Sequence, residues 1–179
     1  MFPVGPRVAS RAPQRTCGSC SATGVRCKAA AVRSRGNTVI NASVIGRVFI
    51  TGAKSFILGD RISTDYTGQV LTLAKGDQSL QGKTITIRRP GGAVSLEGGT
   101  ATARDPDFSP FDVGEEYVLF LNYDGDDRFI VPFGAQGAFT VDQGKVTQVS
   151  RDTGTWNRDR GEVPLVQFLG EVGAIQKQP

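Results

Sequence analysis

The stretch EYVLFLNYDGDDRFIVPF, residues 116–133, decides how this chain folds. It holds two runs rich in β-branched and aromatic residues, at 116–123 and 128–133, a composition typical of strands. Between the runs lies the polar segment 124–127, whose Asp-Gly pair favours a tight turn. The stretch therefore predicts a hairpin, with the strongest signal of any in the chain.

A first strand is indicated upstream of this hairpin. In NASVIGRVFIT, residues 41–51, apolar or small residues recur at every second position from Val44 to Ile50, which places them on one face. The pair Gly59-Asp60 further along predicts the turn that follows.

Two further extended runs come next. STDYTGQVLTLAKG, residues 63–76, loses its period of two after Val70, which predicts a β-bulge near Leu71. KTITIRRPGG, residues 83–92, predicts a third strand with its isoleucines inward and its threonines and Arg88 outward.

The remaining β signals are uneven. AVSLEGGTATAR, residues 93–104, predicts an edge segment or an excursion, and the proline-containing segment 105–116 predicts a loop. Residues 137–150 predict another hairpin, which turns at 142–144.

The last element predicted is an amphipathic helix within GEVPLVQFLGEVGAIQ, residues 161–176. Pro164 suits its first turn, and one apolar stripe has helical spacing: Leu165, Phe168, Leu169, Val172 and Ile175. Residues 38–179 are therefore expected to form one all-β domain, a small antiparallel barrel with one C-terminal helix, because a closed sheet leaves few strand edges exposed.

Residues 1–37 differ from this body in composition. Residues 1–36 carry seven of the 21 basic residues and no acid, which leaves 14 basic against 17 acidic residues downstream. The segment is expected to be a disordered basic tail, either a targeting segment or a non-native start. Because the body is mildly anionic, the overall charge of +4 does not indicate a nucleic-acid-binding domain.

All three cysteines lie in CGSCSATGVRC, residues 17–27. A structural zinc site or an iron–sulfur cluster needs a fourth ligand, which this spacing does not supply. Cys17 and Cys20 have the spacing of a redox pair, but the strand and helix that such a pair requires are not indicated around them. The interpretation preferred over metal or redox chemistry is that the cluster has no role in the folded state.

The sequence contains no histidine, which excludes imidazole bases and histidine zinc ligands. No cofactor motif and no catalytic set is predicted. Asp124, Asp126 and Asp127 offer carboxylate oxygens of the kind that calcium binds, although a hairpin tip explains their clustering without a ligand.

Other polar residues give weaker indications of a site. Asp65, Asp105 and Glu115 are candidates for a pair of hydrolytic carboxylates, with ordinary solvated surface as the default interpretation. Arg88 and Arg89 are candidates for an anion site, with the solvent-facing end of a strand as the default interpretation.

Binding of single-stranded nucleic acid would require exposed aromatic residues among basic ones. Tyr66, Phe120 and Phe129 lie instead at strand positions that are expected to belong to the core. Nucleic acid is therefore not an expected partner.

The order of SVIGRV, YTGQVLTLAKG, ITIRRPGG and FDVGEEYVLFL resembles the netrin-like domain, the OB-type barrel of tissue inhibitors of metalloproteinases. It resembles more closely the exported bacterial proteins that share this layout. The resemblance covers roughly residues 39–175, and its most specific pieces are the KG at 75–76 and VGEEYVLF at 113–120. It implies an OB-like fold for the body.

The resemblance also implies a non-enzymatic, exported module, periplasmic or extracellular, that binds another protein. A metalloproteinase inhibitor of netrin-like type is the alternative, and a carboxylate-based hydrolase is third. No cysteine follows Cys27, so the inhibitors' disulfides and N-terminal chelating cysteine are not transferred to this chain. A cytoplasmic or organellar location is the alternative to export, and no integral membrane segment is expected.

If the cysteine cluster has no folded role, replacing Cys17, Cys20 and Cys27 by serine together leaves the melting temperature unchanged. Differential scanning calorimetry of the triple variant measures this. A clear fall in Tm, or stoichiometric zinc in the purified wild type, would contradict it.

Overall fold

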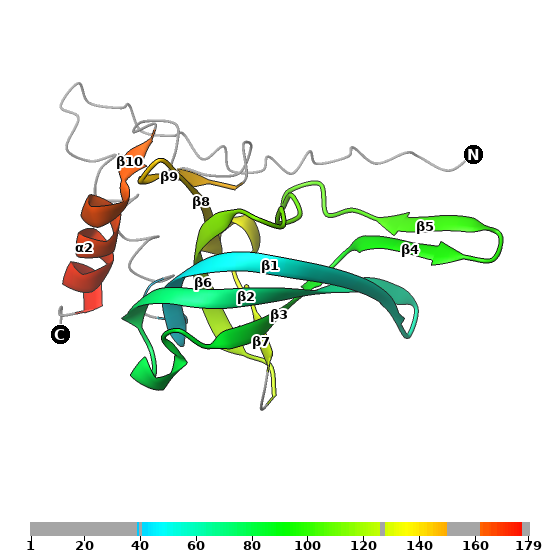
Figure 1. Cartoon of the computed structure of the whole chain (residues 1–179), viewed down its shortest axis with the longest axis horizontal. Helices are drawn as coiled ribbons and strands as arrows, with labels where there is room; N and C mark the ends of the chain where they lie inside the picture. Colours follow the sequence, from blue (N-terminus) through cyan, green and yellow to red (C-terminus); the bar gives the residue numbers. More distant parts are fainter. Residues whose placement is uncertain (1–38, 40, 126–127, 150–161, 177–179) are drawn as a thin grey trace, which may run out of the picture.

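A computed structural model describes residues 39, 41–125, 128–149 and 162–176. This part of the chain is mostly β, with an eight-stranded mixed sheet, a separate two-stranded sheet and one C-terminal helix (Figure 1). The predicted basic tail with its three cysteines lies outside the described residues, as do Asp126 and Asp127.

The strands and helix have the following bounds: β1 Val44–Leu58, β2 Arg61–Lys75, β3 Thr84–Pro90, β4 Gly92–Leu96, β5 Gly99–Ala103, β6 Glu116–Tyr123, β7 Arg128–Ile130, β8 Ala138–Asp142, β9 Lys145–Gln148, β10 Val163–Pro164 and α2 Leu165–Gln176. Two short 3-10 turns, η1 Gln78–Leu80 and η2 Gly134–Gly137, connect them.

Five strands pair in a ring. β1 pairs with both β2 and β6, while β3 joins β2 to β7 and β7 pairs back to β6. Beyond the ring, β8, β9 and β10 extend the sheet from β6. Arg47 of β1 forms an ion pair with Glu116 of β6 and so links the two strands that complete the ring.

The prediction of a wholly antiparallel sheet is wrong at one pair, because β3 and β7 run parallel. Strands that follow each other through a short turn pair antiparallel, whereas parallel neighbours need a long connection. Here β4, β5, the loop 104–115 and β6 all lie between β3 and β7 in the sequence, which provides that connection.

The predicted bulge at Leu71 is confirmed. Arg47 lies opposite Thr72 and Val48 opposite Val70, so that Leu71 is the extra residue on β2. A bulge bends its strand and increases the local twist. At this position it helps β1 and β2 to curve around the ring.

Strand β6 is buried on both faces. Tyr117, Leu119 and Leu121 point into a first core, which contains residues of all five ring strands. Val118 and Phe120 point the other way, into a second core that includes residues of β8, β9 and α2. The continuous apolar run YVLFL is explained by this double burial.

The aromatic residues expected in the core are there. Tyr66, Phe120 and Phe129 are 5%, 3% and 4% exposed. Helix α2 confirms the predicted apolar stripe, since Phe168 and Val172 are buried in the second core and Leu165, Leu169 and Ile175 pack against it. None of the described helices is both long and apolar enough to span a membrane.

The turn at Gly59-Asp60 and the hairpin that turns at Gln143-Gly144 also agree with prediction. The second strand of the hairpin 116–133 is shorter than predicted and ends at Ile130. Pro132 explains the difference, because proline has no backbone N–H to donate to a neighbouring strand.

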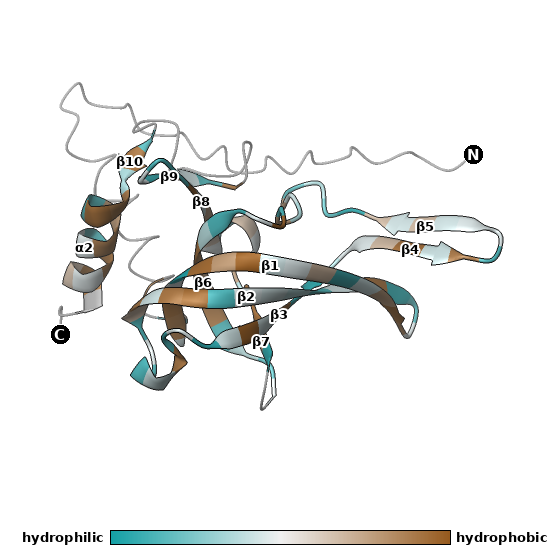
Figure 2. Cartoon of the chain, in the orientation of Figure 1, coloured by the Kyte–Doolittle hydropathy of each residue, from teal (hydrophilic) through white to brown (hydrophobic). Residues whose placement is uncertain are grey.

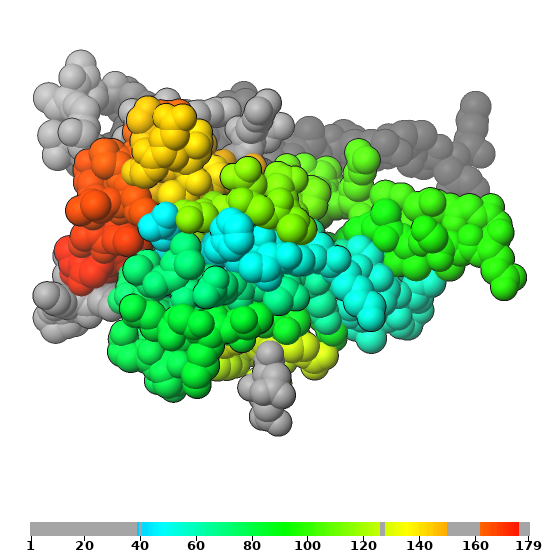
Figure 3. Space-filling model, viewed as in Figure 1, coloured from blue at the N-terminus to red at the C-terminus, as the bar shows by residue number. Residues whose placement is uncertain are grey.

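Two hairpin arms project from the side of the molecule opposite α2 (Figures 1 and 3). The first arm is the distal part of β1 and β2, residues 53–66, and the second arm is the β4–β5 hairpin, residues 92–103. The second arm is the excursion predicted for residues 93–104. Its two strands form a sheet of their own.

Gly68 on β2 lies close against side chains of the first core. A Cβ atom there would lie 2.5 Å from Val48 Cγ1 and 3.5 Å from Ile50 Cδ1. Gly68→Ala should therefore lower the free energy of unfolding by about 1–3 kcal/mol, as overpacked cores do. Urea denaturation measures this change.

Gly52→Ala is the matched control on the neighbouring strand. A Cβ at Gly52 would meet only Thr67 atoms at 3.8 Å, an ordinary contact. This variant should unfold at nearly the same urea concentration as wild type. If Gly68→Ala changed the free energy of unfolding as little as Gly52→Ala, the packing around Gly68 would be looser than the 2.5 Å distance implies.

Candidate functional site

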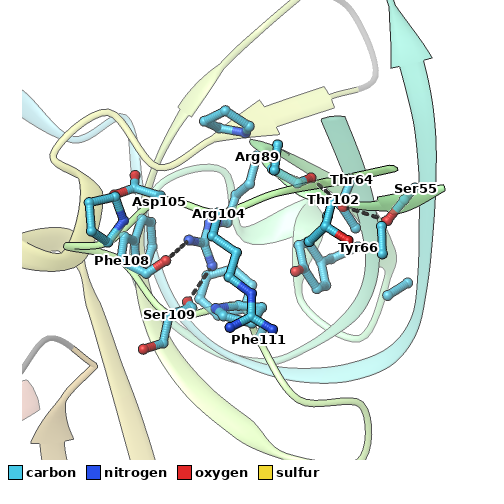
Figure 4. A pocket seen from close by; sticks show the side chains of 18 residues that line it. Ser55, Thr64, Tyr66, Arg89, Thr102, Arg104, Asp105, Phe108, Ser109 and Phe111 are labelled. Carbon is cyan, nitrogen blue, oxygen red and sulfur yellow. Dashed lines mark hydrogen bonds between the residues drawn. The ribbon is translucent and has the colours of Figure 1, made fainter. Parts of the chain in front are cut away.

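A pocket of about 700 Å³ opens where the two arms meet the loop 104–111 (Figure 4). Its lining is largely apolar, with alanines from both arms and prolines and phenylalanines from the end of β3 and the loop. Hydroxyl and charged side chains also line it, and those that carry a full charge at neutral pH are Arg89, Arg104 and Asp105.

Arg89 is the central residue of the pocket. It is only 4% exposed, so the expectation that both arginines lie on the solvent-facing end of their strand is wrong for Arg89. Ile85, Ile87 and Arg89 alternate on the inward face of β3, and this period of two was the signal that could have predicted the burial.

The loop wraps around the Arg89 guanidinium. Nη1 donates a hydrogen bond of 2.7 Å to the Ser109 carbonyl, and Nη2 donates one of 2.8 Å to the Phe108 carbonyl (Figure 4). The guanidinium carbon lies 3.3 Å from the centre of the Phe108 ring and 4.6 Å from that of Phe111. These contacts fix both the side chain and the loop.

The positive charge of Arg89 has no ion-pair partner among the described residues. Its Nε–H is buried and has no hydrogen-bond acceptor among these residues. Burial lowers the pKa of Arg89 to about 10, and the surrounding Tyr66 and Asp105 oppose this shift. The group therefore remains charged at neutral pH and gives the pocket a positive potential.

An aromatic cluster supports the loop from inside the ring. Phe111 packs between Tyr66 and Tyr117, with ring centres 5.1 Å and 4.8 Å away, and Phe108 packs on Phe111. The Tyr117 hydroxyl accepts a 2.9 Å hydrogen bond from the Asp112 backbone N–H. Burial raises the pKa of Tyr66 and that of Tyr117, so both stay neutral at physiological pH.

A chain of hydroxyl groups joins the bases of the arms. Thr64 Oγ1 donates to the Gly91 carbonyl at 2.7 Å, which leaves the Ser55 hydroxyl to donate to Thr64 at 2.8 Å. Gly92, with φ of +130°, lies directly against this pair, and any Cβ at that position would collide with both hydroxyls. The first arm is thus fastened to the start of the second.

Arg104 and Asp105 lie on the exposed part of the pocket wall. Asp105 Oδ1 accepts a 3.0 Å hydrogen bond from the Asp107 backbone N–H, which shapes the turn. Arg104 forms no ion pair within the described part of the chain. Its guanidinium is therefore available to a ligand.

The candidate hydrolytic carboxylates are not gathered in the pocket. Asp65 accepts two hydrogen bonds of 2.7 Å from Arg88, which also lies over the Phe56 ring at 4.8 Å. Asp105 lines the pocket, whereas Glu115 does not. Asp65 and Arg88 therefore form an ion pair between β2 and β3 and are not part of the pocket.

Of the three aspartates considered for a calcium loop, only Asp124 lies within the described residues. Its backbone N–H donates to the Arg128 carbonyl at 2.8 Å and closes the β6–β7 hairpin, as a plain turn requires. Within the described ranges, there is no group of three or more acidic or cysteine side chains placed to hold a metal ion.

No protein-family model matches the sequence, and no curated protein sequence is significantly similar to it.

If Arg89 holds the loop, Arg89→Met should increase amide hydrogen exchange in residues 104–112 several-fold. The overall stability should change little, because the loss of two charge-assisted hydrogen bonds is offset by removal of a desolvated charge. Hydrogen exchange with mass spectrometry, together with a thermal melt, measures both quantities.

Arg88→Met is the matched control, since it removes the same charge from the adjacent residue and breaks the pair with Asp65 instead. It should leave exchange in the loop at the wild-type rate. Loop exchange that is unchanged in Arg89→Met would contradict the role of Arg89.

Proposed function

We propose that this chain is a non-enzymatic binding module that holds part of a partner protein in the pocket between its two arms. The observation that carries the proposal is Arg89, a buried guanidinium without an ion-pair partner in the described residues, in the wall of a 700 Å³ pocket. A buried charge of this kind costs stability unless something compensates it. An anionic group of a partner would supply that compensation.

The size and lining of the pocket support binding. Ligand sites in proteins typically measure about 300–1,000 Å³ and combine apolar walls with a few placed polar groups. The pocket has this character, and the hydrogen bonds of Arg89 and the Ser55–Thr64–Gly91 chain hold its walls in place before any ligand arrives. A preorganised site loses less entropy on binding.

Catalysis by paired carboxylates has less support. Glycoside hydrolysis needs two carboxyl groups that face each other across the substrate. Among the described residues that line the pocket, Asp105 is the only acid, and its Oδ1 is engaged by the Asp107 N–H. Binding is therefore preferred over hydrolysis for this pocket.

The arm tips supply further contact surface. Ile57 and Leu58 at the tip of the first arm and Leu96 at the tip of the second are each about half exposed, at 52%, 51% and 51%. Figure 2 colours both arms mostly pale or hydrophilic, with some apolar positions toward their ends. Apolar side chains on either side of a charged pocket suit contact with another protein.

The same proposal includes an OB-type barrel and export from the cell. The ring in which β1 pairs with both β2 and β6 supports a small, partly open barrel of five strands. Export rests on the resemblance to netrin-like domains alone. Inhibition of a metalloproteinase would require a reactive edge built without the N-terminal cysteine of the inhibitors, so it stays the second candidate.

Site-specific photo-crosslinking tests the proposal. Thr102 lines the pocket and is exposed, so p-benzoylphenylalanine at Thr102 should give light-dependent adducts with one partner in extracts of the source cells and their medium. The same residue at Gln81, which is exposed beyond η1 and away from the pocket, is the control and should give none. Equal adducts at both positions, or adducts at Gln81 alone, would refute the pocket as the binding site.

A further inference from the structure

We infer that the group bound in this pocket is a carboxylate joined to an apolar body. The inference rests on the proposed function and specifies the chemistry of the ligand. It follows from three features of the pocket: its charge, its accessible donors and its apolar walls.

The charge of the pocket matches a monoanion. Its fully ionised side chains among the described residues are the cations Arg89 and Arg104 and the anion Asp105, which leaves one net positive charge. A carboxylate carries one negative charge at neutral pH, whereas a phosphate monoester carries about 1.5 to 2. A phosphate would thus leave part of its charge unmatched beside Asp105.

The two arginines have different roles. Arg104 is exposed and has no ion pair within the described ranges, so its guanidinium can form the two parallel N–H···O bonds that suit a carboxylate. Arg89 is held rigidly by the Ser109 and Phe108 carbonyls and acts through its positive potential. Because Arg89 is already desolvated, its attraction for an anion is screened less than that of a surface arginine.

The walls select what the carboxylate is attached to. Ala53 and Ala93 come from the two arms, and Pro106, Phe108, Pro110 and Phe111 come from the loop. These surfaces offer contact to an aliphatic or aromatic body but few hydrogen bonds. A hydrophilic anion such as free sulfate or phosphate would leave them uncovered.

Two sources present this chemistry, a free organic acid and the C-terminus of a polypeptide whose last side chain is apolar. The partner protein proposed above would supply the second. The full chain should be titrated with 4-phenylbutanoate, with its neutral amide and with phenyl phosphate, at millimolar concentrations, while binding is followed by NMR shifts of the residue 104–111 amides. A hexapeptide ending in Phe is then compared with its C-terminally amidated form.

The expected result is saturable binding of 4-phenylbutanoate and of the free-acid peptide, at least tenfold tighter than that of either amide. A free-acid peptide that binds better than 4-phenylbutanoate identifies a protein terminus, and the reverse order identifies a small acid. Either order supports the carboxylate. Tighter binding of phenyl phosphate, or equal binding of acid and amide, or no binding by any acid, would overturn the inference.

The variant that tests the donor is Arg104→Gln, which should weaken acid binding by about tenfold, as expected for loss of a charge-assisted hydrogen bond. Because Arg104 is exposed, this change should leave the fold intact, and a thermal melt checks that it does. Arg61→Gln removes the same charge from an exposed position at the tip of the first arm and should leave the affinity unchanged. An equal loss in both variants would show that only the overall charge matters, and it would also refute the inference.

These outcomes are separable from failure of the proposed function. Partner adducts at Thr102 together with equal binding of acid and amide would keep the binding module and reject the carboxylate. Acid binding that depends on Arg104, without adducts at Thr102, would keep the ligand chemistry and reject a protein partner.

Discussion

The double burial of strand β6 is the constraint on which the rest of this structure depends. Its alternate residues enter the first core inside the ring and the second core beneath α2, so one strand holds both halves of the fold together. Because β6 pairs with β1, β7 and β8, it is also the point where the ring and the outer strands join. A polar residue in YVLFL would therefore disturb one of the cores whichever way it pointed.

The pocket is a consequence of how far β1 and β2 continue beyond these cores. Each strand runs for 15 residues, and the distal parts leave the ring and form the first arm. Gly91 and Gly92 then turn the chain from β3 into the second arm, where the Thr64 hydroxyl meets the Gly91 carbonyl. The loop 104–111 returns across the base of both arms and is held there by Arg89. The walls of the pocket thus come from four separate segments of the chain.

Arg89 joins the stability of this region to its proposed role. Its hydrogen bonds to two loop carbonyls and its contact with the Phe108 ring stabilise the loop, while its desolvated charge opposes that stability. A neutral hydrogen-bond donor could hold the loop without the cost of desolvating a charge. The retention of a charge at a buried position that opens onto a pocket is what makes ligand binding the preferred explanation.

The sequence by itself determined the local elements: the hairpin after Tyr123, the bulge at Leu71, the turn at Gly59-Asp60 and the apolar stripe of α2. Each depends on a periodicity or a turn residue that acts over a few neighbours, and such signals are visible in a single chain. Only the tertiary structure decided the parallel pairing of β3 with β7 and the loop contacts that cover Arg89. The period of two places Arg89 on the inward face of β3. The loop that covers it there comes from residues about twenty positions further along the chain. Contacts between segments so distant in the sequence leave no local pattern, because they arise from the way the whole chain packs.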